Sequence, residues 1–396
     1  MNKMTVRDIE VTGRRVLVRV DFNVPFDAKT GAIKDDSRIR ASLPTIKYLT
    51  AHNAKVILLS HLGRPKGKVV DEMRLAPVAK RLSEILGKKV YTAPDCIGQE
   101  AEKAAAALKA GDVLILENLR FHPEEEKGED KFAKALSSLG DIYINDAFGT
   151  SHRAHASTSV ITNYLPAVAG FLLEKEIDTL GGLLESPAHP FAGLFGGAKV
   201  SDKVAMLKNI MSKVDCLLIG GGMAATFLKA KSYGVGTSQV ETDIINIAAV
   251  LIKEIEKKHD CLHLPVDVVV ADKIDSGVIG KIVSIDAVPP DKMIVDIGPR
   301  TIELFSKELK KSRTVFWNGP MGVEEIPQFA KGTHALAKLL PRLKAKTIVG
   351  GGSTAEVITA LGLADKITFV STGGGASLEF LGGKALPGVV ALRDKI

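Results

Sequence analysis

The feature that most constrains the fold is an alternation of apolar, largely β-branched runs with helical stretches. In the first half of the chain the apolar runs lie within residues 16–24, 54–65, 112–121 and 141–155, and the helical patterns cover 42–52, 75–86, 97–110 and 129–139. Unbroken Val, Ile and Leu strands that alternate with helices predict a parallel sheet covered on both faces. Ligands bind such sheets beyond the carboxyl ends of the strands.

Basic and polar side chains follow the apolar runs at those ends. They are Arg19, Asp21 and Asn23 after the first run, His61 and Arg64 after the second, Arg120 after the third, and His152, Arg153 and His155 after the fourth, with Arg38 at the start of the first helical stretch. Any one of them could be an ordinary surface charge. Because guanidinium groups bind phosphate and carboxylate in bidentate geometry, arginines at several strand ends indicate a domain for a small polyanion.

The second half repeats a different pattern, in which an apolar strand runs into two or three glycines and then a helix. The repeats occupy residues 191–203, 216–228, 347–358 and 367–380. Glycine destabilises strands and helices, so such clusters indicate a positive φ or close approach of the backbone to a ligand. The phosphates and flat base of a nucleotide fit this requirement. Further strands are expected within 264–273 and 293–300, and Trp317 is expected in the core.

The first of these repeats, LFGGAKVSDK, predicts a strand from Phe191 to Phe195, a glycine turn and the start of a helix. On one continuous helix Lys199 and Lys203 would be four residues apart and would share a face. Two lysines at a helix start oppose the helix dipole unless an anion binds there. The alternative is a pair of solvated surface lysines.

Two nucleotide-binding patterns narrow the function further. The P-loop pattern GxxxxGK[ST] does not occur in the sequence, which excludes that class of site. The dinucleotide pattern GxGxxA begins at Gly220 and again at Gly350, which favours an alternative function as an NAD-dependent dehydrogenase. That alternative needs an acidic residue at the end of the next strand, whereas Glu241 lies in the polar stretch GTSQVETD.

Length and charge exclude other classes. The 396 residues suffice for two domains, and the net charge of +7 is spread along the chain without a basic block, so no nucleic-acid partner is expected. An excess of positive charge suits a phosphorylated small molecule better. No apolar run approaches the ~20 residues of a membrane span, and the N-terminus lacks the apolar core of a signal peptide, so a cytoplasmic location is expected.

The three cysteines, Cys96, Cys216 and Cys261, are far apart in sequence and form no CxxC motif. This spacing predicts free thiols in a reducing compartment, with neither a disulfide framework nor a zinc site.

The domain organisation follows from residues 164–190. Apolar residues recur there at helical spacing until the segment SPAHP stops the run, so we expect an interdomain helix over 169–185, between a first domain of residues 1–168 and a second of 186–379. An ordinary crossover helix within one domain is the alternative. The fold class is therefore α/β, with two Rossmann-like domains that are each a parallel sheet covered by helices and that are joined by a hinge helix.

A nucleotide and a phosphorylated acid on separate domains is the organisation of a phosphotransferase that works by domain closure. No Ser–His–Asp or activated Cys arrangement is evident, which favours direct transfer without a covalent enzyme intermediate. Positioning and charge stabilisation can carry phosphoryl transfer almost alone.

Nine motifs, in order along essentially the whole chain, resemble the phosphoglycerate kinase family. They are RVDFNVP, DDSRIRASLPTI, SHLGRP, LENLRF, NDAFGTSHRAHAS, GGAKVSDK, GGGMAATFL, WNGPMGV and STGGGASLE. The resemblance implies a cytoplasmic monomer of glycolysis. It also implies reversible transfer of the acyl phosphate of 1,3-bisphosphoglycerate to Mg-ADP, which gives 3-phosphoglycerate and ATP, with Mg²⁺ as the cofactor.

The resemblance also implies roles for individual residues. The triose-binding set is Asp21, Phe22, Asn23, Arg38, His61, Leu62, Gly63, Arg64, Arg120 and Arg153. Arg38 and Lys199 would flank the transferring phosphoryl group as the catalytic residues. The nucleotide would be held by Lys203, by Glu325 at the ribose, and by the phosphate loop of Gly351, Gly352, Ser353 and Thr354. The tail, residues 380–396, would return to pack on the first domain. The sequence pattern predicts that the last apolar piece of this tail is strand-like.

The sequence departs from the family pattern at three positions, and the expected effect on nucleotide binding differs among them. Ser353 stands where the family has an aspartate near the magnesium, so the metal ligand is unknown and weaker binding of Mg-nucleotide is expected. Glu324 replaces an aromatic residue beside the ribose acid, and Arg300 replaces a lysine with little expected effect. Ser353 also leaves open an alternative function as a sensor of nucleotide or sugar phosphate that has lost the chemistry.

Overall fold

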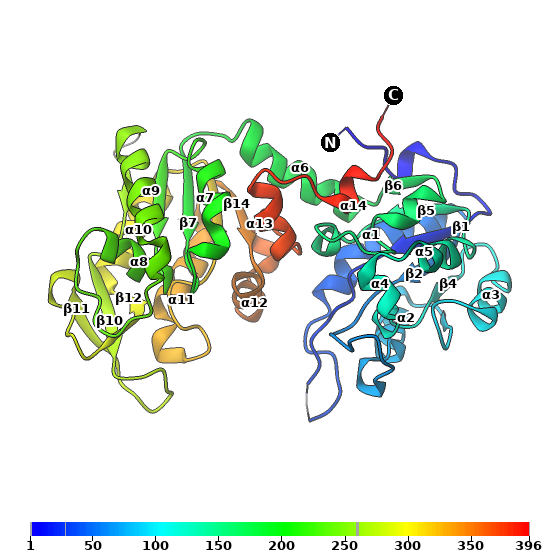
Figure 1. Cartoon of the computed structure of the whole chain (residues 1–396), viewed down its shortest axis with the longest axis horizontal. Coiled ribbons are helices and arrows are strands. Elements are labelled where there is room, and N and C mark those ends of the chain that lie inside the picture. Colours follow the sequence, from blue (N-terminus) through cyan, green and yellow to red (C-terminus); the bar gives the residue numbers. More distant parts are fainter. Residues whose placement is uncertain (1, 28, 259–260, 396) are drawn as a thin grey trace. The chain divides into compact units, whose positions relative to one another are not determined.

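The computed structural model describes residues 2–27, 29–258 and 261–395, and the chain divides into two compact units (Figure 1). Unit 1 comprises Met1–Asp178 with Ala385–Ile396, and unit 2 comprises Thr179–Lys384. The first boundary falls inside helix α6, Phe171–Glu185, and not at either of its ends. No helix of the described residues is long and apolar enough to cross a membrane.

Unit 1 is built on a six-stranded sheet in the order β3-β4-β2-β1-β5-β6, and every neighbouring pair is parallel. The strands are β1 Arg15–Arg19, β2 Lys55–Leu59, β3 Val90–Thr92, β4 Val113–Ile115, β5 Ile142–Asn145 and β6 Ala167–Ala169. Its helices are α1 Ser37–Ala51, α2 Ala76–Leu86, α3 Gln99–Ala106, α4 Pro123–Lys127 and α5 Asp130–Ser137. The central strands are buried almost throughout, so the predicted parallel sheet covered by helices is confirmed.

Unit 2 contains a second six-stranded parallel sheet, in the order β15-β14-β13-β7-β8-β9. Its strands are β7 Phe191–Phe195, β8 Cys216–Ile219, β9 Leu262–His263, β13 Thr314–Asn318, β14 Lys346–Gly350 and β15 Phe369–Val370. The helices are α7 Val204–Ile210, α8 Met223–Ala230, α9 Ile245–Lys258, α10 Pro299–Lys311, α11 Lys331–Leu339, α12 Gly352–Ala360 and α13 Gly375–Leu381. Trp317 is fully buried in this unit, as expected.

The further strands expected within 264–273 and 293–300 do form, but outside the parallel sheet. Strands β11 Lys281–Ser284, β10 Asp267–Ala271 and β12 Met293–Ile297 make a separate antiparallel sheet, which the sequence pattern did not distinguish. Their short apolar runs are compatible with a parallel or an antiparallel sheet, because the neighbouring strand decides which of the two forms.

Two local predictions are wrong. The interdomain helix was expected to begin at residue 169, but Ala167–Ala169 form edge strand β6, and α6 begins only at Phe171. The last apolar piece of the chain was expected to be strand-like, but it contains helix α14, Pro387–Val390, with proline at its first turn. Proline is preorganised for that position, because its fixed φ suits a helix and it needs no hydrogen-bond acceptor there.

The final residues lie against the beginning of the chain in unit 1 (Figure 1). The Met4 N–H donates to the carbonyl of Arg393 at 2.8 Å, and Lys3 forms an isolated bridge with Asp394. Asn145, fully buried at the end of β5, donates through Nδ2 to the carbonyl of Gly388 at 2.8 Å. The last segment is therefore part of the hydrogen-bonded structure of unit 1.

The prediction of three free thiols is wrong for two of the cysteines. Cys216, at the start of β8, is joined by a disulfide to Cys261, which directly precedes β9, and their Cα atoms are 4.7 Å apart. The crossover through α8 and α9 places β9 beside β8, so residues 45 apart in sequence become neighbours across a ladder. Sequence spacing does not reveal this pairing. Cys96 is a buried free thiol.

Candidate active site

Asp21 is the centre of a charged cluster at the carboxyl end of β1. Its carboxylate forms an ion pair with Arg38, which lies in the first turn of α1, and lies 4.0 Å from Nδ1 of His61, which follows β2. Arg19, on β1 and 1 % exposed, approaches the same His61 Nδ1 at 3.2 Å from the buried side. Residues from two strand ends and one helix start are thus brought together, as predicted.

A second chain of contacts extends the same edge of the sheet. Asn23 Oδ1 accepts from the Gly63 N–H at 2.8 Å, and Arg120 Nη1 donates to the Gly63 carbonyl at 2.8 Å. Arg120 Nε lies 3.1 Å from Glu126, whose carboxylate is also 4.0 Å from Arg153. The arginines predicted at the third and fourth strand ends therefore share one carboxylate.

The remaining members of the predicted set have less distinctive surroundings. Phe22 and Leu62 are buried, and their N–H groups donate to Ser60 Oγ and Asn118 Oδ1 at 3.0 and 3.1 Å. Arg64 is exposed and forms no ion pair with another residue in the described part of the chain. Its guanidinium group is consequently available to an external anion.

The positive charge of this edge comes from arginine and not from histidine. Burial lowers the pKa of His61 well below its ordinary value. The neighbouring arginines lower this pKa further, whereas Asp21 acts to raise it. Burial, followed by Arg19 and Arg120, lowers the pKa of His155 to about 3. Burial acts to raise the pKa of Asp21, but the arginines and His61 outweigh it and hold that pKa below its ordinary value. At neutral pH the cluster thus holds two neutral imidazoles among charged guanidinium groups.

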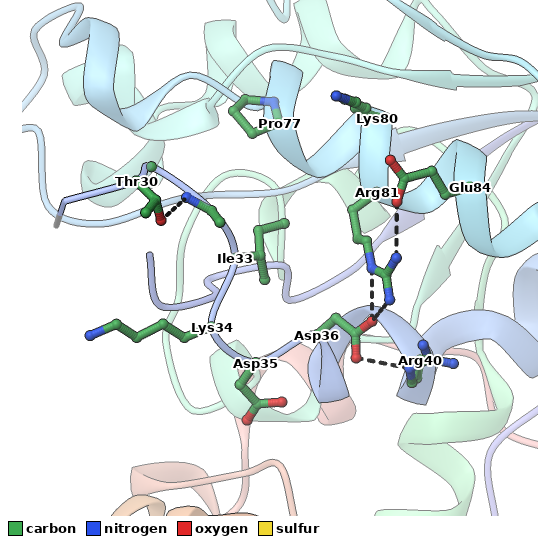
Figure 2. Close-up of a pocket in the computed structure, with 12 residues that line it drawn as sticks. Thr30, Ile33, Lys34, Asp35, Asp36, Arg40, Pro77, Lys80, Arg81 and Glu84 are labelled. Atoms are coloured by element: carbon green, nitrogen blue, oxygen red, sulfur yellow. Dashed lines mark hydrogen bonds and ion pairs between the residues drawn. The ribbon is translucent and has the colours of Figure 1, made fainter. Parts of the chain in front are cut away.

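A large cavity in unit 1 lies apart from this cluster. It has a volume of about 650 Å³ and lies between residues 30–36 and helix α2 (Figure 2). Arg81 pairs there with both Asp36 and Glu84, and Arg40 pairs with Asp36 (Figure 2). None of the predicted substrate residues lines this cavity, and its arginines are neutralised by protein carboxylates. It does not have the character of the predicted anion site.

In unit 2, three glycine turns pack directly on one another beyond the ends of β7, β8 and β13. Gly196 N–H donates to the Asn318 carbonyl at 2.9 Å, and Gly197 N–H to that of Pro320 at 2.8 Å. Gly319 has φ +96°, and a Cβ atom there would lie 2.2 Å from the carbonyl oxygen of Gly196. The glycines are therefore required first by the contact between turns.

The prediction that Lys199 and Lys203 share one helix face is wrong. Residues after Gly197 stay irregular, Lys203 ends the 3-10 turn Ser201–Lys203, and α7 begins only at Val204. Glu241 holds this turn, because its carboxylate accepts from the Val200 N–H at 2.6 Å and from the Ser201 N–H at 3.2 Å. These N–H groups, which were expected to face an anion, are satisfied within the protein.

The two lysines still differ in a useful way. Lys199 is exposed, whereas Lys203 is half-buried and its ammonium lies against the turn, 3.2 Å from where a Cβ on Gly197 would stand. Burial lowers the pKa of Lys203 below its ordinary value. Only Lys203 is thus held close to the glycine turns.

A pocket of about 310 Å³ opens beside these turns. It is lined by backbone and small side chains on one side and by acidic groups on another, including Gly197, Ala198, Gly221, Gly222, Ala225, Pro320, Met321, Gly322, Val323, Glu324, Glu325 and Ser353. Gly221 has φ +63°, and a Cβ there would meet the Pro320 carbonyl at 2.5 Å. A wall of glycine backbone beside apolar side chains such as Met321 and Val323 suits a flat ligand.

The predicted phosphate loop lies at the start of α12, next to the same pocket. Gly351 has φ +91°, Ser353 is exposed, and buried Thr354 accepts through Oγ1 from the Gly319 N–H at 2.7 Å. This bond joins the loop to the glycine turn after β13. No carboxylate occurs within the loop itself.

Asn318 was missed as a site residue. Its Nδ2 is buried, has no hydrogen-bond partner among the described residues, and would lie 3.0 Å from a Cβ on Gly351. Asn318 ends an apolar strand directly before a Gly-Pro turn, which is the same signal that identified Asn23. It offers an unused donor to a ligand of the loop.

Glu324 has an unusual environment for a carboxyl group. Its Oε2 atom is buried and has no hydrogen-bond partner in the described part of the chain. Burial, followed by Glu325 and Glu356, raises its pKa to about 7. The group is therefore largely neutral below that pH and negative above it, on the wall of the pocket.

Comparison with known proteins covers both units. The family model for phosphoglycerate kinase matches residues 6–384. The phosphoglycerate kinases of Moorella thermoacetica and Pelotomaculum thermopropionicum are each 55% identical over 395 residues, which span 100% of both chains. Among solved structures, phosphoglycerate kinase from Coxiella burnetii has a TM-score of 0.85 at 40% identity, and that from Pyrococcus horikoshii 0.87 at 34%. Both alignments cover 98% of each chain.

The ionisation of Glu324 predicts a pH-dependent affinity for ADP. Because its pKa is raised to about 7, the pocket gains a negative charge above that pH, which opposes the nucleotide phosphates. Between pH 6 and pH 8 the dissociation constant should rise about 3–10-fold more in the wild type than in Glu324→Gln, which stays neutral. Calorimetric titration at both pH values measures the difference.

The matched control is Glu303→Gln, an exposed glutamate on α10. It should leave the pH dependence of the wild type unchanged. Equal pH profiles for wild type and Glu324→Gln would contradict the assignment.

Proposed function

The chain belongs to the phosphoglycerate kinase family, and we propose that it transfers the acyl phosphate of 1,3-bisphosphoglycerate to Mg-ADP, directly and in line after hinge closure. The products are 3-phosphoglycerate and ATP, and the reaction is reversible. The observation that carries this proposal is the match over 100% of the chain, which includes both the arginine cluster and the glycine turns. The resemblance extends the proposal to a cytoplasmic monomer, and nothing in the comparisons favours the dehydrogenase alternative.

Unit 1 supplies the phosphoglycerate site in this proposal. Arg64 and the Arg120–Arg153 pair bind the phosphate and carboxylate groups, since guanidinium matches their geometry. Asp21 orients Arg38 through their ion pair. Burial, supported by the neighbouring Arg19, lowers the pKa of His61 and keeps it neutral, so that His61 can hydrogen-bond the substrate without adding charge. Asn23 and Gly63 fix the loop that presents these groups.

Unit 2 supplies the nucleotide site. The base lies between the glycine walls of the pocket, Glu325 binds the ribose, and Lys203 with the loop Gly351–Thr354 binds the phosphates. Asn318 Nδ2, buried beside that loop without a partner among the described residues, donates to a phosphate oxygen. Mg²⁺ normally takes one or two carboxylates together with phosphates and water. Because Ser353 offers only a hydroxyl, Mg²⁺ is held here chiefly by the phosphates and water.

The chemical step needs charge stabilisation more than acid–base chemistry. In the direction of ATP use, a carboxylate oxygen of 3-phosphoglycerate bonds to the γ-phosphorus as the bond to the β-phosphate oxygen breaks, so no proton has to move. Negative charge spreads over the three equatorial oxygens of the transferring group. Arg38 and Lys199 stabilise that charge, and Mg²⁺ supplies further neutralisation when it is bound with the nucleotide.

The activity itself is tested with 3-phosphoglycerate and Mg-ATP in the presence of hydroxylamine, which converts an acyl phosphate to a hydroxamate. We expect hydroxamate only when both substrates and Mg²⁺ are present. Calorimetric titration of the same protein with ATP distinguishes the kinase from the sensor function. Nucleotide binding without any hydroxamate would favour the sensor function instead.

Arg38→Ala should lower kcat by roughly 10²–10³, the effect of losing one preorganised charge donor in the transition state. The control is Arg40→Ala on the same helix, because Arg40 is exposed and pairs with Asp36 outside the cluster. Its kcat should stay within about twofold of the wild type. Steady-state kinetics distinguishes the roles, since a change in KM alone for Arg38→Ala would limit this residue to substrate binding.

Ser353→Asp should tighten binding of Mg-ADP by roughly tenfold, because it adds a charged oxygen ligand for a hard cation. Binding of ADP without Mg²⁺ should not tighten, since the new carboxylate repels the phosphates. Ser353→Ala serves as the control and should bind Mg-ADP nearly as well as the wild type. Equal affinity of Ser353→Asp and wild type for Mg-ADP would show that position 353 does not limit metal binding.

A further inference from the structure

Four side chains able to bind a metal converge at one edge of the unit 2 sheet, apart from the residues assigned above. They are Cys216 at the start of β8, Cys261 and His263 at β9, and Glu308 on α10. Their ligand atoms all lie within 4.8 Å of one another. Two sulfurs, one imidazole nitrogen and one carboxylate oxygen form a set of ligands that favours a thiophilic cation such as Zn²⁺.

The fold explains why these residues meet. Strands β8 and β9 pair in parallel with Leu217 opposite Leu262, so Cys216 and Cys261 are neighbours at the amino end of the ladder. Side chains alternate along a strand, so His263 points to the same face as Cys261. Helix α10 packs on this face, because its Phe305 and Leu309 belong to the same apolar core as Cys216. Glu308 lies beside them.

The separations already approach those of a tetrahedral site. Cys261 Sγ lies 3.6 Å from His263 Nε2, and that nitrogen lies 4.0 Å from Glu308 Oε1. With metal–sulfur and metal–nitrogen bonds of about 2.3 and 2.1 Å, a regular tetrahedron needs about 3.6 Å between S and N and about 3.4 Å between N and O. Small side-chain rotations would suffice for the histidine and glutamate.

Charge and burial also suit a cation. Cys216 is buried, and the side chains of His263 and Glu308 are 26% and 14% exposed. Lys311 Nζ donates to both carboxylate oxygens of Glu308, at 2.7 and 3.0 Å. Two thiolates and one carboxylate around a divalent cation leave one net negative charge, which this ammonium offsets.

We propose that Cys216, Cys261, His263 and Glu308 form a redox-controlled site that binds a thiophilic divalent cation only after the disulfide is reduced. In the disulfide the two sulfurs are bonded to each other and cannot act as thiolate ligands. A dithiol reductant donates two electrons and two protons, so that its own sulfurs become a disulfide and the protein gains two thiols. Metal binding then releases those two protons, because thiolates are the ligands.

The site is independent of phosphoryl transfer. Cys216 lies at the amino end of β8, whereas the glycine turn that lines the nucleotide pocket follows its carboxyl end at Ile219. The inference therefore does not depend on the proposed kinase activity. Its test uses spectroscopy of the metal site and not turnover.

A thiol count tests the redox part. Under denaturing conditions without reductant, the full chain should show one reactive thiol, that of Cys96, out of three cysteines. After treatment with a dithiol and its removal under anaerobic conditions, it should show three. Three reactive thiols before reduction would show that no disulfide is present and would overturn the proposed redox control.

Cobalt tests the metal part, because Co²⁺ bound by thiolates in tetrahedral geometry has distinctive charge-transfer and d–d absorption. The reduced protein should bind one Co²⁺ with these bands, Zn²⁺ should displace it, and the oxidised protein should show neither. Cys216→Ser should abolish the thiolate bands. His263→Ala should weaken Co²⁺ binding by more than about 10–100-fold, which is the usual loss when a residue hydrogen-bonded to a metal ligand is removed.

Cys96→Ser is the matched control, because Cys96 lies in a second group with Asp95 and His122. It should leave the cobalt spectrum unchanged. If Cys216→Ser does not fold, His263→Ala decides the question, since this half-buried residue lies on an edge strand. Absence of thiolate bands in the reduced wild type, their persistence at full affinity in His263→Ala, or their loss in Cys96→Ser would each overturn the site.

Discussion

Direct contact between backbone turns is the interaction on which the pocket of unit 2 depends. The turns after β7, β8 and β13 pack so closely that a single Cβ on Gly319 would stand 2.2 Å from the Gly196 carbonyl oxygen. Thr354 then ties the start of α12 to the same turns through its bond from the Gly319 N–H. The pocket wall and the phosphate loop are consequently one hydrogen-bonded assembly, so a side chain added at these glycines would disturb both.

Unit 1 achieves similar rigidity with a buried charge. The Arg19 guanidinium is fully enclosed and donates to Ser157 Oγ at 2.8 Å, while Ser157 in turn donates to Glu125 Oε1 at 2.6 Å. Burial raises the pKa of Glu125, and Arg19 acts against that effect. Because Arg19 and Glu125 are opposite buried charges joined through Ser157, removal of either one would leave the other charge buried and uncompensated. The exposed arginines of the cluster therefore lie next to buried charged residues that hydrogen bonds hold in place.

The sequence was most informative where local pattern and global fold agree. The alternation of apolar runs and helices predicted both parallel sheets. The positions of Asp21 and His61 after strands, and of Arg38 at a helix start, predicted that these residues meet at one edge of the first sheet. It failed where a distant residue decides the local structure. Glu241 satisfies the N–H groups that would have begun a helix at Lys199, and β9 reaches β8 only through a long crossover, which hides the disulfide of Cys216 from any spacing rule. Asn318 also stands at the end of an apolar strand, so the same strand-end rule identifies it as a site residue.

The return of the last residues to unit 1 has a consequence for how the chain is made. Unit 2 is one continuous segment, Thr179–Lys384, whereas unit 1 also contains the segment Ala385–Ile396. Unit 1 is synthesised first, yet the residues that bond to Met4 and Asn145 are synthesised only after the whole of unit 2. The usual order, in which N-terminal domains finish folding first during translation, is thus reversed for its final step. Unit 1 therefore stays incomplete until unit 2 has been synthesised.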